Sequence, residues 1–180
     1  ILTGAALIRE REQGTVEHLL VMPVTAFEIM AGKIWSMGAV VLAATAFSLF
    51  VVVETLLGVP IEGSRALFML GAGLDILAMT CLGLFLATVA GSMPQFALLA
   101  MMVLMPLQLL SGGVNPRENM PQIIQTIMFA APNTHFVILS QAVLFRGAGL
   151  AGVWPQLAAL AAISAALFAF ALHRFRQFLR

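Results

Sequence analysis

The sequence IWSMGAVVLAATAFSLFVVV at residues 34–53 contains no charged side chain. A bilayer core of about 30 Å needs roughly 20 apolar residues in an α-helix, so this segment is long enough to cross a membrane. The rest of the chain has the same character, since 61% of its 180 residues are hydrophobic and only 9% are charged. A soluble domain carries about 25% charged residues to solvate its surface. The composition therefore predicts an all-α, polytopic bundle of transmembrane helices in a lipid bilayer.

Several further segments have the length and composition of a membrane span. Polar or glycine- and proline-containing turns at residues 60–65 and 91–94 separate them. The first eight residues look like the end of another span, and the chain does not begin with Met. We therefore expect a fragment of a longer protein. The predicted spans cover residues 34–58, 66–90, 96–111 and 153–172, with residues 1–8 as the end of a preceding span.

Glycines and prolines interrupt residues 112–152 repeatedly. Two apolar pieces within this region, residues 123–131 and 136–145, are each too short to cross a bilayer. Re-entrant or interfacial helices fit that length. We predict a pair of short helices here, with Asn133-Thr134-His135 as the polar turn between them.

Lysines and arginines near the ends of the spans predict the orientation, because cytoplasmic loops carry an excess of these residues. Placing residues 9–33 inside puts six basic residues on the cytoplasmic side and three outside. Region 112–152 is then external. The cytoplasmic set is Arg9, Arg11, Lys33, Arg174, Arg176 and Arg180, and the external set is Arg65, Arg117 and Arg146.

The sequence REREQGTVEHLLVMPV at residues 9–24 concentrates charge between two apolar segments. Gly14 and Pro23 are expected to break the helix, and the apolar side chains between them share one face of a short amphipathic helix. Thr25 and Glu28 have the spacing of a capping box that begins the next helix. From the residues alone, the short helix either rests on the lipid headgroups as a linker or docks on a soluble partner.

The same segment closely resembles the ABC-2 type transporter permeases, above all their bacterial drug-efflux-like members. The pattern Arg-Glu-Arg-Glu-x-Gly-Thr-x-Glu-x-Leu-Leu-x-x-Pro-Val carries the resemblance, followed by Glu28 and Gly32-Lys33. Later segments resemble the family in the same order, so the similarity runs from Arg9 to the C-terminus. These segments are residues 110–113, 120–136 and 145–155.

The resemblance implies the C-terminal part of a six-helix permease in the bacterial inner membrane. Residues 9–33 would be the cytoplasmic coupling loop, and residues 112–152 the external re-entrant hairpin. The implied partners are an ATP-binding cassette ATPase subunit and a second permease copy, in a homodimer or a heterodimer. The residues implied to dock on or couple to the ATPase are Arg9, Glu10, Arg11, Glu12, Gly14, Thr15, Glu17, Leu19, Leu20 and Pro23.

The implied function is that of a permease subunit of an ATP-driven exporter, which itself catalyses no reaction. Its cargo would be drug-like, a lipid or another amphiphile. The sequence has no Gly-x-x-x-x-Gly-Lys-Ser/Thr phosphate loop, so ATP and Mg²⁺ are expected on the partner and no cofactor on this chain. The single cysteine, Cys81, excludes a disulfide framework and a thiolate metal cluster within these residues. The net charge of +1 gives no indication of nucleic-acid binding.

Asp75 is the basis of an alternative function. A charged side chain in the middle of a span costs about 2.5–3.5 kcal/mol, so such residues are often functional. Asp75 either lies in the translocation path, binding a substrate cation or a proton, or is a structural residue that is hydrogen-bonded to neighbouring helices or water. The first case describes an ion-coupled secondary transporter or channel, active without an ATPase and sensitive to Asp75→Asn. A membrane scaffold that only anchors a soluble complex is a third hypothesis.

Small residues also recur in the predicted span around Asp75. They are expected to allow close approach of neighbouring helices rather than to carry chemistry. These residues are Gly71, Gly73, Ala78 and Gly83.

Overall fold

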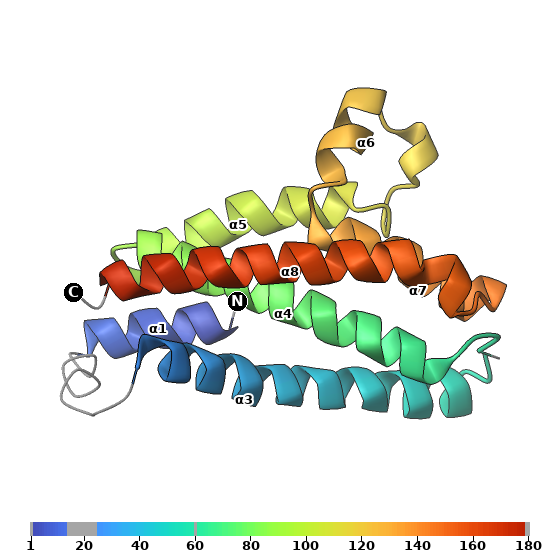
Figure 1. Cartoon of the computed structure of the whole chain (residues 1–180), viewed down its shortest axis with the longest axis horizontal. Helices are drawn as coiled ribbons and strands as arrows, with labels where there is room; N and C mark the ends of the chain where they lie inside the picture. Colours follow the sequence, from blue (N-terminus) through green and yellow to red (C-terminus); the bar gives the residue numbers. More distant parts are fainter. Residues whose placement is uncertain (1, 14–24, 60, 179–180) are drawn as a thin grey trace.

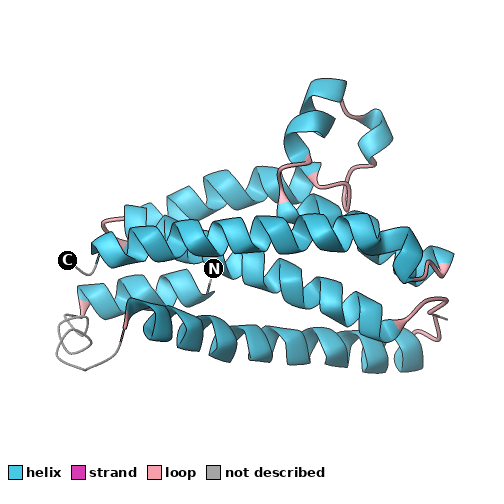
Figure 2. Ribbon diagram, viewed as in Figure 1, coloured by secondary structure: helices cyan, strands magenta, loops and turns pink. Residues whose placement is uncertain are grey.

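The computed structural model describes residues 2–13, 25–59 and 61–178, and this part of the chain consists of helices and their connecting loops (Figures 1 and 2). One long helix changes from α to π geometry part-way along its length, so that α3 and η1 follow each other without a loop. The elements are α1 (Leu2–Glu12), α3 (Ala26–Phe47), the π-helix η1 (Ser48–Leu56), α4 (Arg65–Val89), α5 (Met93–Leu110), the 3₁₀ helix η2 (Arg117–Asn119), α6 (Gln122–Met128), α7 (Pro132–Arg146) and α8 (Leu150–Phe178).

Four helices in the described residues are long and apolar enough to cross a membrane. They cover Phe27–Leu56, Arg65–Val89, Met93–Leu110 and Leu150–Gln177. The fold is therefore the predicted all-α, polytopic bundle. The last of these helices begins at Leu150, ahead of the predicted start at residue 153.

The pair formed by α6 and α7 bends by 95° at a short break. Figure 1 shows α6 standing away from the bundle, whereas α7 lies beside α8. Neither helix is long enough to cross a membrane alone, which is the geometry of a re-entrant or broken segment.

The predicted turn at Asn133-Thr134-His135 is wrong, because these residues form the first turn of α7. Pro132 begins that helix, and proline suits this position because its missing N–H would have no partner there. The break lies instead at residues 129–131. A hydrogen bond spans this break, because Nε2 of His135 lies 2.7 Å from the carbonyl oxygen of Phe129.

Helix α4 is the centre of the bundle. It packs against α1, α3, α5, α7 and α8. In its most apolar stretch 44% of the residues are buried, against 6% for the helix formed by α3 and η1 and 11% for α5. Two apolar clusters flank it, one around Leu84, Phe96 and Phe175 and the other around Leu139 and Leu160. Much of the surface of α3 and α5 is therefore not covered by the described part of the bundle.

The ends of the helices divide in the way that the charge bias predicts. The C-terminal ends of α1 and α8 and the N-terminal end of α3 lie at one end of the bundle (Figure 1). The beginning of α4 and the end of α7 lie at the other. The elements that carry Arg9, Lys33 and Arg174 are thus at the opposite end of the bundle from the helix ends that carry Arg65 and Arg146.

Helix α1 crosses α4 at a contact between two glycines. A Cβ atom added to Gly4 would lie 2.4 Å from the carbonyl oxygen of Gly83 and 2.8 Å from Cζ of Phe96. Gly71, Ala78 and Gly83 are buried in α4, in agreement with their predicted packing role. Gly73 is different, because a Cβ atom there would meet nothing within 4 Å.

We predict that Gly4→Ala destabilises the protein. The added methyl group meets backbone rather than a flexible side chain, so α1 must move off α4, and overpacking of this kind costs about 1–3 kcal/mol. Thermal unfolding of the purified protein in detergent measures the effect. Gly73→Ala is the matched control, and its midpoint should not fall. Equal loss of stability in both variants would contradict the importance of the Gly4–Gly83 crossing.

Candidate functional site

A capping box marks the start of α3, directly after the charged segment in the sequence. Thr25 N donates a hydrogen bond to Glu28 Oε2 at 2.7 Å, and Glu28 N donates to Thr25 Oγ1 at 3.3 Å. Both halves of the predicted capping box are therefore present. The box satisfies amide groups that the first helical turn leaves without partners, which fixes where α3 begins.

An ion pair joins the two helices on either side of this segment. Lys33 Nζ on α3 lies 2.5 Å from Glu10 Oε1 on α1. Only 20% of the lysine side chain and 31% of the glutamate side chain are exposed. Partial burial reduces screening by solvent, so this pair holds the end of α1 against the first turns of α3.

A second carboxylate of the segment contacts α5. Glu12 Oε1 accepts a hydrogen bond from Met93 N at 2.8 Å, at the first residue of α5. Ser92, which precedes the helix, makes no side-chain capping bond. A carboxylate at a helix N-terminus satisfies a free amide and interacts favourably with the helix dipole. Glu12 therefore caps α5 from a different helix.

The predicted docking residues fall into two groups. Residues 9–12 form the last turn of α1, where Arg9 is exposed and Glu10 and Glu12 make the contacts above. The other predicted residues lie outside the described residues, and the docking role of both groups stays a prediction. These are Gly14, Thr15, Glu17, Leu19, Leu20 and Pro23. Sequence reasoning missed the contacts of Lys33 and Met93, which depend on the packing of α1 against two distant helices.

Asp75 lies half-way along α4 and shares a helix face with the buried residues Gly71 and Ala78, four residues before it and three after it. Its Oδ1 atom is buried and has no hydrogen-bond partner among the described residues. Next to it, the carbonyl oxygen of Leu74 accepts a 3.0 Å hydrogen bond from Ser164 of α8. Asp75 therefore lies on the inner side of the bundle.

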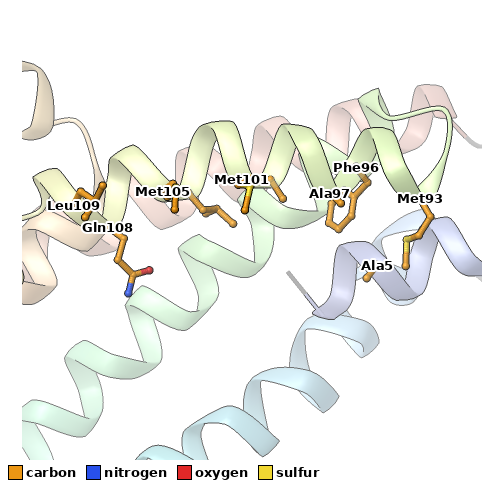
Figure 3. Close-up of a pocket in the computed structure, with 10 residues that line it drawn as sticks. Ala5, Met93, Phe96, Ala97, Met101, Met105, Gln108 and Leu109 are labelled. Carbon is orange, nitrogen blue, oxygen red and sulfur yellow. The ribbon is translucent and has the colours of Figure 1, made fainter.

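An apolar groove of about 580 Å³ runs along α5 (Figure 3). Met101, Met105 and Gln108 line it from successive turns of α5, and Ala5 of α1 closes one end. Gln108 is the one polar side chain among its lining residues. A second groove, of about 530 Å³, lies between α3 and α4 and is lined by Trp35 and several small residues.

The described residues contain no group of three or more His, Cys, Asp or Glu side chains close enough together to hold a metal ion.

Comparison with known proteins agrees with the family resemblance of the sequence. The family profile described as "ABC-2 type transporter" matches residues 1–145. The chain belongs to the ABC-2 type transporter family. It is a multi-pass protein of the inner membrane, as its apolar helices and an inner-membrane relative indicate.

Two relatives from Escherichia coli strain K12 illustrate the similarity. The chain is 61% identical over 177 residues to the inner membrane transport permease YhhJ, a match covering 98% of this chain and 47% of YhhJ. It is 32% identical over 178 residues to the probable multidrug ABC transporter permease YbhR, covering 98% of this chain and 48% of YbhR. The chain thus spans about half the length of these relatives. No solved structure matches it.

We predict that Glu10 and Lys33 are energetically coupled. Lys33→Glu would place two carboxylates together, whereas the exchanged pair Glu10→Lys with Lys33→Glu would restore the attraction. A double-mutant cycle on thermal unfolding of the full-length permease should give a coupling energy of about 0.5–1 kcal/mol. The control cycle uses Arg9→Glu with Glu10→Lys, because adjacent helical residues do not face each other. A coupling energy near zero for the Glu10–Lys33 cycle would contradict the prediction.

Proposed function

We propose that this chain is part of the membrane-spanning permease of an ATP-binding cassette exporter. The exporter moves a drug-like, lipid or other amphiphilic substrate across the inner membrane, and a separate subunit hydrolyses ATP. Membership of the ABC-2 family and the similarity to a probable multidrug permease support this proposal. The observation that carries it is the last turn of α1, where Glu10 pairs with Lys33 of α3 and Glu12 caps α5.

The proposed coupling site is the segment between α1 and α3, where the ATPase would dock. Docking changes the equilibrium between inward- and outward-open states only if the ATPase binds the two states unequally. Because Glu10 joins Lys33 and Glu12 caps α5, a displacement of the end of α1 acts on α3 and α5 together. The Arg9–Glu12 turn would thus connect the docking residues, among them Thr15 and Glu17, to two helices with exposed faces.

The groove along α5 is the proposed substrate surface. Its volume falls in the range of about 300–1,000 Å³ that is usual for small-molecule sites. Methionine side chains are flexible and polarizable, so a surface with Met101 and Met105 adapts to apolar ligands of different shape. Gln108 offers a hydrogen bond to a polar group. This combination suits an amphiphile, and a second permease copy would close the exposed face of α5.

Asp75 supports the alternative of an ion-coupled transporter, because its buried Oδ1 has no hydrogen-bond partner among the described residues. In that mechanism a cation or proton bound at Asp75 would drive transport without ATP. The residues that line the groove along α5 do not include Asp75. We therefore place it second.

The proposal predicts a stable complex between the full-length permease and the ATP-binding subunit encoded beside it, with hydrolysis controlled by the coupling segment. Glu17→Arg should leave the permease inserted but lower permease-dependent ATP hydrolysis about tenfold, which is within the usual range of coupling between sites. ATPase activity of the reconstituted complex is the measurement. Glu62→Arg, the same charge reversal at an exposed residue of the opposite end, is the control.

Two outcomes would count against this proposal, and a third would count against the assigned role of Glu17. The absence of a complex with any cassette subunit would remove ATP-driven export. Transport that proceeds without an ATPase and is lost in Asp75→Asn would favour the ion-coupled alternative. Normal hydrolysis and transport by Glu17→Arg would show that Glu17 is not a docking residue.

The groove gives a separate prediction. Met105→Trp should fill part of the cavity and reduce export of a fluorescent amphiphile, such as ethidium, several-fold without weakening the complex with the ATPase. Leu98→Trp is the matched control, since Leu98 is an exposed residue of α5 that does not line this groove. Equal export by Met105→Trp and Leu98→Trp would exclude the groove as the substrate surface.

A further inference from the structure

We propose that a polar pocket at the predicted external end of the bundle binds the phosphodiester headgroup of a membrane phospholipid. The pocket has a volume of about 490 Å³ and lies between residues 112–118 and helix α7. Its polar lining consists of Arg117, Glu118, Gln141 and Arg146. The pocket is distinct from the coupling segment and from the groove along α5.

Arg117 is held in place by two neighbours. Its guanidinium carbon lies 4.4 Å from the centre of the Phe129 ring, a cation–π contact. On the other side its aliphatic stem packs on Gly112, where an added Cβ atom would lie 2.7 Å from Cγ of Arg117. Gly112 has φ +97°, a conformation that glycine adopts readily. A cation fixed in this way loses little conformational entropy when it binds a ligand.

The net positive charge of the pocket lining can be balanced by a ligand that carries one negative charge. Arg117 and Arg146 contribute +2 and Glu118 contributes −1, which leaves +1. The ion pairs in the described part of the chain are Lys33–Glu10 and Arg65–Glu54, so neither pocket arginine is neutralised by a carboxylate there. A phosphodiester carries a single negative charge, and guanidinium groups bind phosphate oxygens through paired N–H bonds. The carboxylate of Glu118 disfavours a dianion such as free phosphate.

The apolar part of the lining favours a lipid over a soluble anion. Val137 and Ile138 of α7 line the same pocket and can contact the glycerol and the first methylenes of the acyl chains. Trp154, four residues into α8, is 61% exposed close to this end of the bundle. Exposed tryptophans of membrane proteins concentrate at the level of the headgroups. The pocket is therefore at the depth where a phosphodiester is found.

The test measures binding of phosphatidylglycerol to the purified full-length permease in an uncharged detergent, by native mass spectrometry. Diacylglycerol with the same acyl chains is the uncharged comparison lipid. Arg146→Gln and Arg117→Gln should each weaken phosphatidylglycerol binding about tenfold, the effect of losing a charge-assisted hydrogen bond. Arg174→Gln is the control, because it removes an exposed arginine at the opposite end of α8. This variant should bind phosphatidylglycerol as tightly as the unmodified permease does.

The variants also separate binding from folding. Arg117→Gln removes packing against Phe129 and Gly112, so its thermal unfolding is measured alongside. Arg146 is exposed, and Arg146→Gln should retain the unfolding midpoint of the unmodified permease. Weaker phosphatidylglycerol binding by Arg146→Gln, with an unchanged unfolding midpoint, would therefore be enough to support the proposed lipid site.

Three results would overturn the proposal. The first is unchanged phosphatidylglycerol binding in both arginine variants. The second is equal binding of diacylglycerol, which lacks the phosphodiester. The third is displacement of the lipid by low millimolar inorganic phosphate, which would identify a site for free phosphate. None of these results depends on ATP-driven export, because the readout is lipid binding.

Discussion

The structure depends on how closely other helices can approach α4. In a bilayer every backbone polar group must be satisfied within the protein, so the chain forms helices, and small residues allow those helices to pack. The contact of Gly4 with Gly83 brings α1 onto α4, and Gly71 leaves room for Leu139 of α7. Once α1 lies there, Glu10 and Glu12 reach α3 and α5. The contacts of Glu10 and Glu12 thus depend on the uncharged contact between Gly4 and Gly83.

The helix formed by α3 and η1 illustrates a second principle. Few of its residues are buried, yet an ion pair anchors it at each end. Lys33 contacts Glu10 of α1 at one end, and Glu54 contacts Arg65 at the start of α4 at the other. Such a helix has little apolar packing along its length and polar attachments at both ends. It can therefore shift without disrupting many buried apolar contacts. This arrangement suits an element that transmits a displacement.

Sequence reasoning succeeded where the physical cause is local or compositional. Apolar length predicts helices that can span a membrane, and the spacing of Thr25 and Glu28 predicts the capping box. It failed at Asn133-Thr134-His135, where polar residues suggested a turn although Pro132 favours a helix start. The Glu12–Met93 bond joins residues 81 positions apart, and no local pattern predicts it. Pairings of this kind become visible only when the helix packing is known.

The positions of Asp75 and of the groove along α5 also distinguish ion-coupled transport from ATP-driven transport. Asp75 lies on the α4 face that includes the buried residues Gly71 and Ala78, whereas the groove along α5 is lined by α5 residues and by Ala5. An amphiphile moving along Met101 and Met105 would not contact an ion at Asp75. Such an ion could act on the cargo only by shifting α4, the most extensively packed helix of the described bundle. The Arg9–Glu12 turn, by contrast, contacts α5 directly through Glu12, which makes the end of α1 the shorter path to the groove.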